Sequence, residues 1–246
     1  MKTVKGLRAV LYRCVAYLHE KSGVLLGFNG SEFGKPTTKI LLREVAKPVV
    51  VDIGCNVGDF VSEILLVSKE ADLLCFDISP EYEAILHSAH PSANIQFFNL
   101  GLSDRSGFST IVSKKNLDRK AHLNYDAQSI FQGDGEKVRI STLDEALSSL
   151  HLSRIDILKI DTEGFDFKVL LGSHETLQKT QIVIFEIMYR LLLNGNMPQE
   201  ILEFLNAKGF HRFYRLTKHF GLQPIGSISP WQVSTQNIIA SKVKLM

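Results

Sequence analysis

Residues 49–60 combine an apolar run, an acid and two closely spaced glycines. The valines of this run are β-branched and suit a strand that is buried on both faces of a parallel sheet. Asp52 comes near the end of the run, where open α/β sheets bind ligands. Gly54 and Gly58 let the backbone pass close to a ligand, because they have no Cβ. The segment therefore predicts a binding site for a small-molecule cofactor.

The residues around the first glycine indicate which kind of cofactor. A dinucleotide-binding turn needs Gly-x-Gly-x-x-Gly, whose second glycine lets a pyrophosphate reach the backbone. Asn56 stands at that second position, and Asp52 and Asp59 flank the turn. The two carboxylates disfavour a pyrophosphate at the following helix N-terminus. They suit a cationic ligand such as S-adenosylmethionine, and a nicotinamide cofactor is the disfavoured alternative.

The next two apolar runs also end in polar residues. Asp77 ends the second run, and a carboxylate there can accept hydrogen bonds from both hydroxyls of a ribose. A solvated acid that precedes a helix is the alternative reading of Asp77. Asn99 ends the third run and is placed to contact the adenine or the ribose edge. Leu100 or Leu102 would pack on the ring, and a simple turn is the alternative.

Residues 155–164, which read Ile-Asp-Ile-Leu-Lys-Ile-Asp-Thr-Glu-Gly, hold the strongest second signal. Asp161 ends this apolar run, and Glu163 follows it. If this strand neighbours the first one, Asp161 lies beside Asp52, near the methyl end of the donor. A carboxylate there can hold the donor ammonium, deprotonate an acceptor hydroxyl or ligate a divalent metal.

A third acid, Glu186, ends a further apolar run and adds to the same edge of the sheet. Clustered carboxylates are costly unless they are paired or neutralised. Asp161, Glu163 and Glu186 are therefore our candidates for catalytic residues. In the alternative reading, Lys159, on the same strand face as Asp161, and Arg190 neutralise these acids for structural reasons.

The elements that position these acids alternate between strand and helix. Repeated units of this length give a parallel sheet with helices on both faces. Two C-terminal strands with no helix between them suggest an antiparallel pair at the sheet edge. The expected strands are 49–53, 73–77, 94–99, 155–160, 181–187, 210–215 and 235–242, and the expected helices are about 57–68, 80–89, 165–178 and 198–207.

The section 103–142 departs from this alternation. Residues 107–112 and 137–142 read as two extra strands, and the polar stretch 114–135 between them is long for a compact domain. Long loops of this kind often form lids or bind ligands.

The N-terminal segment reads as helical. Apolar residues at 4–21 recur at helical spacing opposite a basic face, and a second helix, capped by Thr37 or Thr38, extends to Val45. We expect residues 1–47 to form a helical extension that packs on a domain of residues 48–246. Contact of the basic helix with a membrane surface is the alternative.

The composition narrows the class of protein. The formal net charge of +2 and the lack of a dense Lys/Arg run exclude a nucleic-acid partner from the expected functions. No run reaches the roughly 18 apolar residues that span a bilayer, and we expect a cytoplasmic protein, in line with its thiols. Cys14, Cys55 and Cys75 show no metal-ligand spacing, and Cys55 and Cys75, in or beside apolar strands, read as buried thiols in a reducing compartment. A divalent metal is possible but not predicted.

These motifs together resemble the FkbM family of S-adenosylmethionine-dependent methyltransferases. The resemblance covers about residues 48–187, and its specific part is the block 159–164 with Leu143-Asp144-Glu145 before it. It implies a Rossmann-like class I methyltransferase fold of the α/β class, with a seven-stranded, mostly parallel sheet that has an antiparallel C-terminal strand pair. Methyl transfer, usually to an oxygen, on a glycan, a polyketide or another specialised small molecule is the implied activity. The other segments that carry it are 51–58, 76–80, 99–104 with Gly107, 141–142, 170–172 and 185–186.

The resemblance also bears on individual residues. Where the family commonly has Glu-Pro after the second strand, this chain has Asp77-Ile78-Ser79-Pro80, and Cys55 replaces a small alanine.

A non-catalytic protein of the same fold that joins a glycan-assembly complex is a further alternative. The expected donor-binding residues are Asp52, Gly54, Asn56, Gly58, Asp77, Asn99, Leu102 and Asp161.

Overall fold

The structure is a computed structural model, which describes residues 33–42, 45–112, 122–123, 137–188, 197–217, 221–228 and 236–246. None of the helices in these ranges is both long and apolar enough to cross a membrane. The predicted N-terminal helix, most of the polar stretch 114–135, Cys14 and Arg190 lie outside the described residues.

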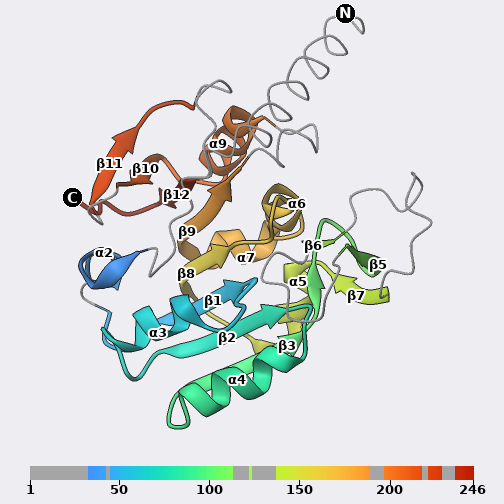
Figure 1. Ribbon diagram of the computed structural model, residues 1–246. Coiled ribbons are helices and arrows are strands. Elements are labelled where there is room, and N and C mark those ends of the chain that lie inside the picture. The colour runs from blue at the N-terminus through green and yellow to red at the C-terminus, as the bar shows by residue number, and fades with distance from the viewer. Residues whose placement is uncertain are drawn as a thin grey trace, which may run out of the picture.

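A central sheet, which has eight strands in the described part of the chain, carries the fold (Figure 1). Its order is β11-β10-β12-β9-β8-β1-β2-β3, so β1 lies in the middle, between β2 and β8. The five strands from β9 to β3 in this order are parallel, and the remaining three are antiparallel. The strands are β1 (Val49–Ile53), β2 (Asp72–Asp77), β3 (Asn94–Asn99), β8 (Ile155–Ile160), β9 (Thr180–Ile187), β10 (Arg212–Leu216), β11 (Leu222–Ile225) and β12 (Gln236–Ser241).

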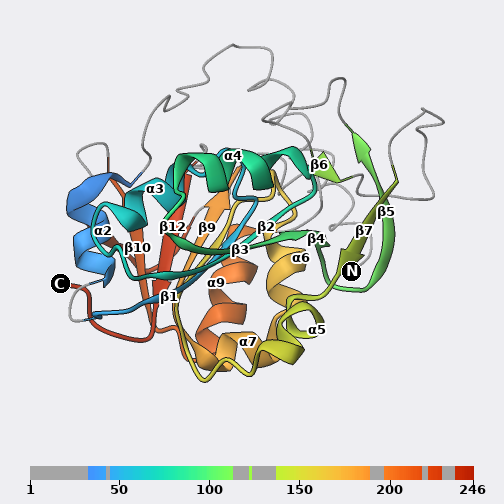
Figure 2. The ribbon, with the colours of Figure 1, turned by 90° about the horizontal axis from the view of Figure 1, so that it is seen from below.

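Helices cover both faces of the sheet (Figure 2). Val50 packs into the core on one face and Val51 into the core on the other, since successive side chains of a strand point to opposite faces. This is why the central strands are mostly apolar on both faces. One face carries α2 (Gly34–Leu42), α3 (Asp59–Leu65) and α4 (Glu81–Ala89), and the other α5 (Leu143–Leu147), α6 (Asp166–Leu171), α7 (His174–Lys179) and α9 (Pro198–Ala207); a short 3-10 turn, η1 (Ser148–Leu150), follows α5.

A second, small sheet is inserted between β3 and α5. Its strands are β4 (Gly101–Leu102), β5 (Gly107–Val112), β6 (His122–Leu123) and β7 (Lys137–Ser141), in the order β4-β7-β5-β6. Val138 and Ile140 of β7 pack with Ile78, which follows β2, and with Phe165, which follows β8. The small sheet therefore adjoins the carboxyl ends of the central strands.

Most predicted elements are confirmed, and three are corrected. The helix predicted over 165–178 is two helices, because the chain turns at Gly172, where an added Cβ would lie 2.1 Å from the carbonyl oxygen of Ser103. Thr37 and Thr38 lie inside α2, which begins at Gly34, and do not cap it. The predicted C-terminal strand pair has a third member, β11, which extends the sheet beyond the expected seven strands.

Candidate functional site

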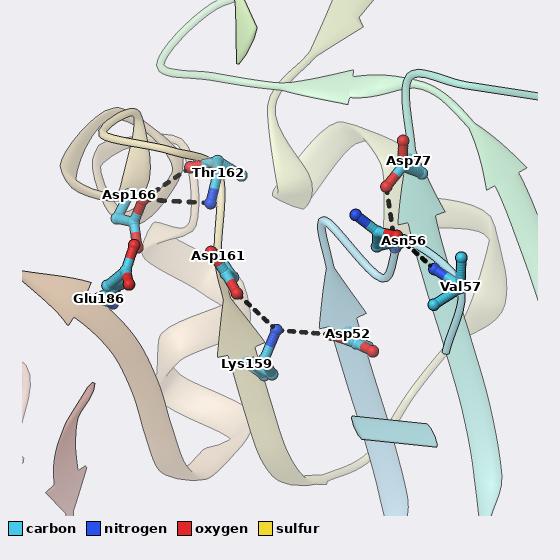
Figure 3. Close-up of polar contacts among 9 residues, drawn as sticks. All are labelled: Asp52, Asn56, Val57, Asp77, Lys159, Asp161, Thr162, Asp166 and Glu186. Atoms are coloured by element: carbon cyan, nitrogen blue, oxygen red, sulfur yellow. Dashed lines mark hydrogen bonds and ion pairs between the residues drawn. The ribbon is translucent and has the colours of Figure 1, made fainter. Parts of the chain in front are cut away.

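The carboxyl ends of β2, β1, β8 and β9 lie next to one another and bring together the acids predicted from the sequence (Figure 3). Asp52 of β1 lies opposite Lys159 of β8 in the strand register, so Asp161 follows directly beside the end of β1. The prediction that Asp161 lies beside Asp52 is confirmed. The site is formed by the turns that follow these strands.

Lys159 lies between two carboxylates. Its Nζ atom is 3.5 Å from Oδ1 of Asp52 and 3.3 Å from Oδ2 of Asp161. The Asp52 side chain is 1% exposed, whereas that of Asp161 is 27% exposed. Burial raises the pKa of Asp52, Lys159 opposes this shift and Asp161 adds to it. Two carboxylates therefore face one lysine in this group, an arrangement that can accept a cationic ligand beside Asp161.

The glycine turn after β1 is held in left-handed backbone conformations. Gly54 has φ 74°, Asn56 has φ 51° and Gly58 has φ 89°. A Cβ on Gly54 would lie 1.9 Å from the carbonyl oxygen of Asp161, and the Asp161 N–H donates to the carbonyl of Ile53 at 2.9 Å. Glycine is therefore required at position 54, since the backbones of the turns after β1 and β8 are in direct contact.

Asp77 ties the glycine turn to β2. Its Oδ2 accepts from the Asn56 N–H at 3.0 Å, and its Oδ1 accepts from the Ser79 N–H at 3.0 Å. Burial raises the pKa of Asp77, and these backbone donors oppose the shift. Each carboxylate oxygen has a further lone pair, so two hydroxyls can still donate to Asp77. Nearby, Asn99 is exposed, and its side-chain amide donates to the Asp77 carbonyl at 3.2 Å.

The turn after β8 also adopts an unusual backbone. Glu163 has φ 54° and Gly164 has φ 102°, and Glu163 is half-buried. Asp166, in the first turn of α6, is fully buried and accepts hydrogen bonds from this turn and from β9. Burial, with a smaller contribution from Asp161, raises the pKa of Asp166 to about 6.

Glu186 lies next to Asp166 (Figure 3), and its side chain is almost completely buried. Its N–H donates to Oδ1 of Asp166 at 3.0 Å. The end of β9 is thus joined to the site through Asp166, although Glu186 is set one strand further from Asp52 than Asp161 is. Lys159 contacts Asp52 and Asp161, as the alternative reading expected of a lysine that neutralises the acids for structural reasons.

Two positions differ from the sequence-based assignment. Leu102 is 2% exposed and belongs to the main core, so it has almost no surface to offer an adenine ring. Asp166 is the second position: it belongs to the site but was not among the predicted residues. Its importance comes from a tertiary contact with β9, and no sequence pattern indicates such a contact.

The described thiols are structural. Cys55 and Cys75 are free and buried, as predicted. Their mutual hydrogen bond and burial raise the pKa of Cys55, which keeps it a thiol and makes it inert as a nucleophile. No group of three or more His, Cys, Asp or Glu side chains in the described ranges is arranged to hold a metal ion.

Comparison with known proteins agrees with this geometry. The family model described as "Methyltransferase FkbM domain" matches residues 52–212. A 2-O-methyltransferase, NoeI of Sinorhizobium fredii, is 29% identical over 173 residues, which cover 65% of this chain and 71% of NoeI. The AMB antimetabolite synthetase AmbE of Pseudomonas aeruginosa is 26% identical over 177 residues, which cover 56% of this chain and 8% of AmbE.

Solved structures show a more distant likeness. A precorrin-6y C5,15-methyltransferase from Geobacter metallireducens is 12% identical, with a TM-score of 0.45, and the match covers 85% of this chain and 87% of that one. A TehB-like SAM-dependent methyltransferase from Corynebacterium glutamicum is 11% identical, with a TM-score of 0.45, over 95% and 99% of the two chains. Because these TM-scores are modest, the fold assignment rests on the strand order and the family match.

Proposed function

The chain belongs to the FkbM methyltransferase family, and we propose that it transfers a methyl group from S-adenosylmethionine to a hydroxyl oxygen of a glycan or another small molecule. The observation that carries the proposal is the group of Asp52, Lys159 and Asp161 beside a glycine turn. Its two carboxylates around one lysine and the close approach of the two backbones support a cationic nucleoside ligand. The name of the relative NoeI, a 2-O-methyltransferase, supports oxygen as the atom that is methylated.

The turns after β1 and β8 are assigned to the methionine side of the donor. Asp161, whose side chain is 27% exposed, is assigned to the donor's ammonium, and Asp52, whose side chain is 1% exposed, acts on the site through its ion pair with Lys159. Gly54 lets the turn approach the Asp161 backbone and Gly58 lets it approach Leu86, and the side chain of Asn56 accepts from the Val57 N–H at 2.7 Å.

Asp77 is assigned to the ribose. This half-buried carboxylate already accepts two backbone N–H groups, which hold it in one orientation and leave lone pairs for the ribose hydroxyls. Charge-assisted hydrogen bonds of this kind are about twice as strong as neutral ones. The exposed amide of Asn99 lies beside the same strand end and is assigned to the ribose edge or the adenine.

The catalytic step needs a proton acceptor and good alignment. When bound, S-adenosylmethionine supplies a methyl group on a positively charged sulfur. Asp161, Glu163 and Glu186 are the candidates to orient the acceptor hydroxyl and take its proton. The side chain of Asp161 is 27% exposed, whereas Glu186 is almost completely buried. The remaining rate enhancement comes from holding the acceptor oxygen in line with the methyl carbon.

Two alternatives are weaker. A nicotinamide cofactor would place its pyrophosphate at the start of α3, where the acid Asp59 occupies the first turn. A non-catalytic protein of this fold would have no need for the buried acids, which cost stability. The polar stretch 114–135 and the predicted helix 4–21, to which acceptor or membrane contacts were assigned, stay predictions.

The proposal is tested by methyl transfer itself. Purified protein is incubated with S-adenosylmethionine and a panel of sugars, glycan fragments and polyketide alcohols, and S-adenosylhomocysteine is measured. We expect at least one hydroxyl acceptor to be methylated and Asp161→Asn to depress that turnover. Turnover that depends on a nicotinamide cofactor instead, or full activity of Asp161→Asn, would contradict the assignment of the reaction or of the base respectively.

A further inference from the structure

Asp166 joins three segments of the chain at one buried carboxylate (Figure 3). Its Oδ2 accepts from the Thr162 N–H at 3.3 Å and from the Thr162 hydroxyl at 2.9 Å. Its Oδ1 accepts from the Glu186 N–H at 3.0 Å. Asp166 itself lies in α6, so it connects that helix to the turn after β8 and to the end of β9.

The turn that Asp166 holds is conformationally strained. Glu163 is not a glycine and yet has φ 54°, a left-handed conformation that is unfavourable for a residue with a side chain. Such conformations persist only where surrounding contacts impose them, and they concentrate at functional sites. Asp166 supplies such contacts one residue before Glu163, at Thr162.

The opposite side of the same turn is held by the glycine turn. The Asp161 N–H donates to the Ile53 carbonyl at 2.9 Å, and the Asp161 carbonyl lies against Gly54. The position of Asp161 is therefore fixed by β1 on one side and by Asp166, through Thr162, on the other. A shift of the turn away from β9 would move Asp161 relative to Asp52 and Lys159.

We propose that Asp166 is a positioning residue of the site, which pins the turn 161–164 to β9 and thereby fixes Asp161 and Glu163 against the glycine turn. The inference rests on the proposed function of these turns as the donor site and adds a residue that acts on them indirectly. Asp166 has no exposed surface, so it does not touch the donor or the acceptor. It acts through the backbone of Thr162 and through Asp161.

The chemistry of the contact explains why an aspartate is found here. All three partners are donors, and an ionised carboxylate is the one small side chain that only accepts. An asparagine of the same shape would direct an NH₂ group at a donor. The burial that raises the pKa of Asp166 to about 6 shows that the ionised form carries a cost, which the structural role offsets.

The chain supplies a matched control in Asp144. This carboxylate accepts from the Thr176 hydroxyl and N–H, both at 2.7 Å, and from the Glu175 N–H at 2.9 Å. It therefore has the same kind of partners as Asp166. It holds the start of α7, however, and none of these contacts involves the turns after β1 and β8.

The test compares four variants of the full chain: Asp166→Asn, Thr162→Val, Thr162→Ser and Asp144→Asn. Hydrogen exchange of the unliganded protein reports on the contacts, and calorimetry with S-adenosylhomocysteine, the expected product of the donor, reports on the site. We expect both Asp166→Asn and Thr162→Val to speed hydrogen exchange at residues 162–164, and Asp166→Asn to speed it at Glu186 as well. Both variants should bind S-adenosylhomocysteine about tenfold more weakly than the wild type does. Thr162→Ser keeps the hydroxyl, so its exchange rates at residues 162–164 and its affinity for S-adenosylhomocysteine should stay within about twofold of the wild-type values.

Asp144→Asn should instead speed exchange at the start of α7 and leave the affinity within about twofold. The proposal is overturned if Asp166→Asn and Thr162→Val bind as tightly as the wild type, or if Asp144→Asn weakens binding as much as they do. If Asp166→Asn does not fold, the comparison of Thr162→Val with Thr162→Ser decides the question. A wild-type protein that does not bind S-adenosylhomocysteine overturns the proposed function and this inference together, whereas unchanged exchange at residues 162–164 overturns this inference alone.

Discussion

The sharpest structural requirement in the site falls on Gly54, and its replacement by alanine has a cost that can be worked from the geometry. The φ of 74° costs an alanine roughly 1–2 kcal/mol. The new Cβ would also lie 1.9 Å from the carbonyl oxygen of Asp161, which belongs to the backbone and must move as a unit. Overpacking of this kind typically adds about 1–3 kcal/mol. We expect Gly54→Ala to lower the free energy of unfolding by about 2–5 kcal/mol.

Alanine variants of two other glycines separate the cost of the left-handed backbone from the cost of the steric clash. Gly209 has φ 93°, and its Cβ would meet only the Cε atom of Lys242 at 3.7 Å, so Gly209→Ala should cost the conformational part alone, about 1–2 kcal/mol. Gly58 has φ 89°, and its Cβ would lie 2.3 Å from Cδ2 of Leu86, the end of a flexible side chain. Gly58→Ala should therefore fall between the other two variants.

Urea unfolding of the wild type and the three variants measures the order of stability. Donor affinity is measured on the same samples, and we expect Gly54→Ala to weaken it strongly because Asp161 must move, while Gly209→Ala leaves it unchanged. The reasoning is refuted if Gly54→Ala is no less stable than Gly209→Ala, or if it binds the donor as tightly as the wild type does.

Three further changes probe the charges of the site. Asp77→Ala should weaken donor binding by calorimetry, because it deletes charge-assisted hydrogen bonds to the ribose; unchanged affinity would refute that assignment. Lys159→Met should lower the free energy of unfolding by about 3–5 kcal/mol, because it leaves Asp52 buried without its ion-pair partner, and adding Asp52→Asn should recover part of the loss in the same urea assay. The pKa of Asp166 in the folded protein, about 6, lies above its ordinary value of 3.8, so the folded state binds this proton more tightly than the unfolded state. The stability of the wild type relative to Asp166→Asn should therefore rise as the pH falls through about 6, by at most about 1.4 kcal/mol per pH unit, and a difference that does not change with pH would contradict the shift.

The central sheet and its acids could be predicted because their signals are local. Apolar runs identify the buried strands, and the carboxyl ends of neighbouring parallel strands must meet at one edge. The positions of Asp52, Asp77 and Asp161 follow from these two facts once the strand order is known. The FkbM-like block 159–164 indicated the family, which the match over residues 52–212 confirmed.

The features that escaped prediction depend on tertiary contacts or on weak patterns. Strand β11 has four residues and contains Pro224, which is tolerated only at a sheet edge, so it gave no strand-like pattern. The break between α6 and α7 arises from the close approach of Gly172 to Ser103. Asp166 gains its role from a contact with Glu186, twenty residues away in the sequence.

Donor binding to the unmodified protein is the most direct test of the proposed site. S-adenosylmethionine and NAD are titrated in turn into the wild type, Asp77→Ala and Asp52→Asn, and the heat of binding is measured. We predict saturable binding of S-adenosylmethionine at one site per chain, weakened in both variants, and no binding of NAD. Binding of NAD without binding of S-adenosylmethionine, or equal affinity of S-adenosylmethionine for all three proteins, would contradict the proposed site.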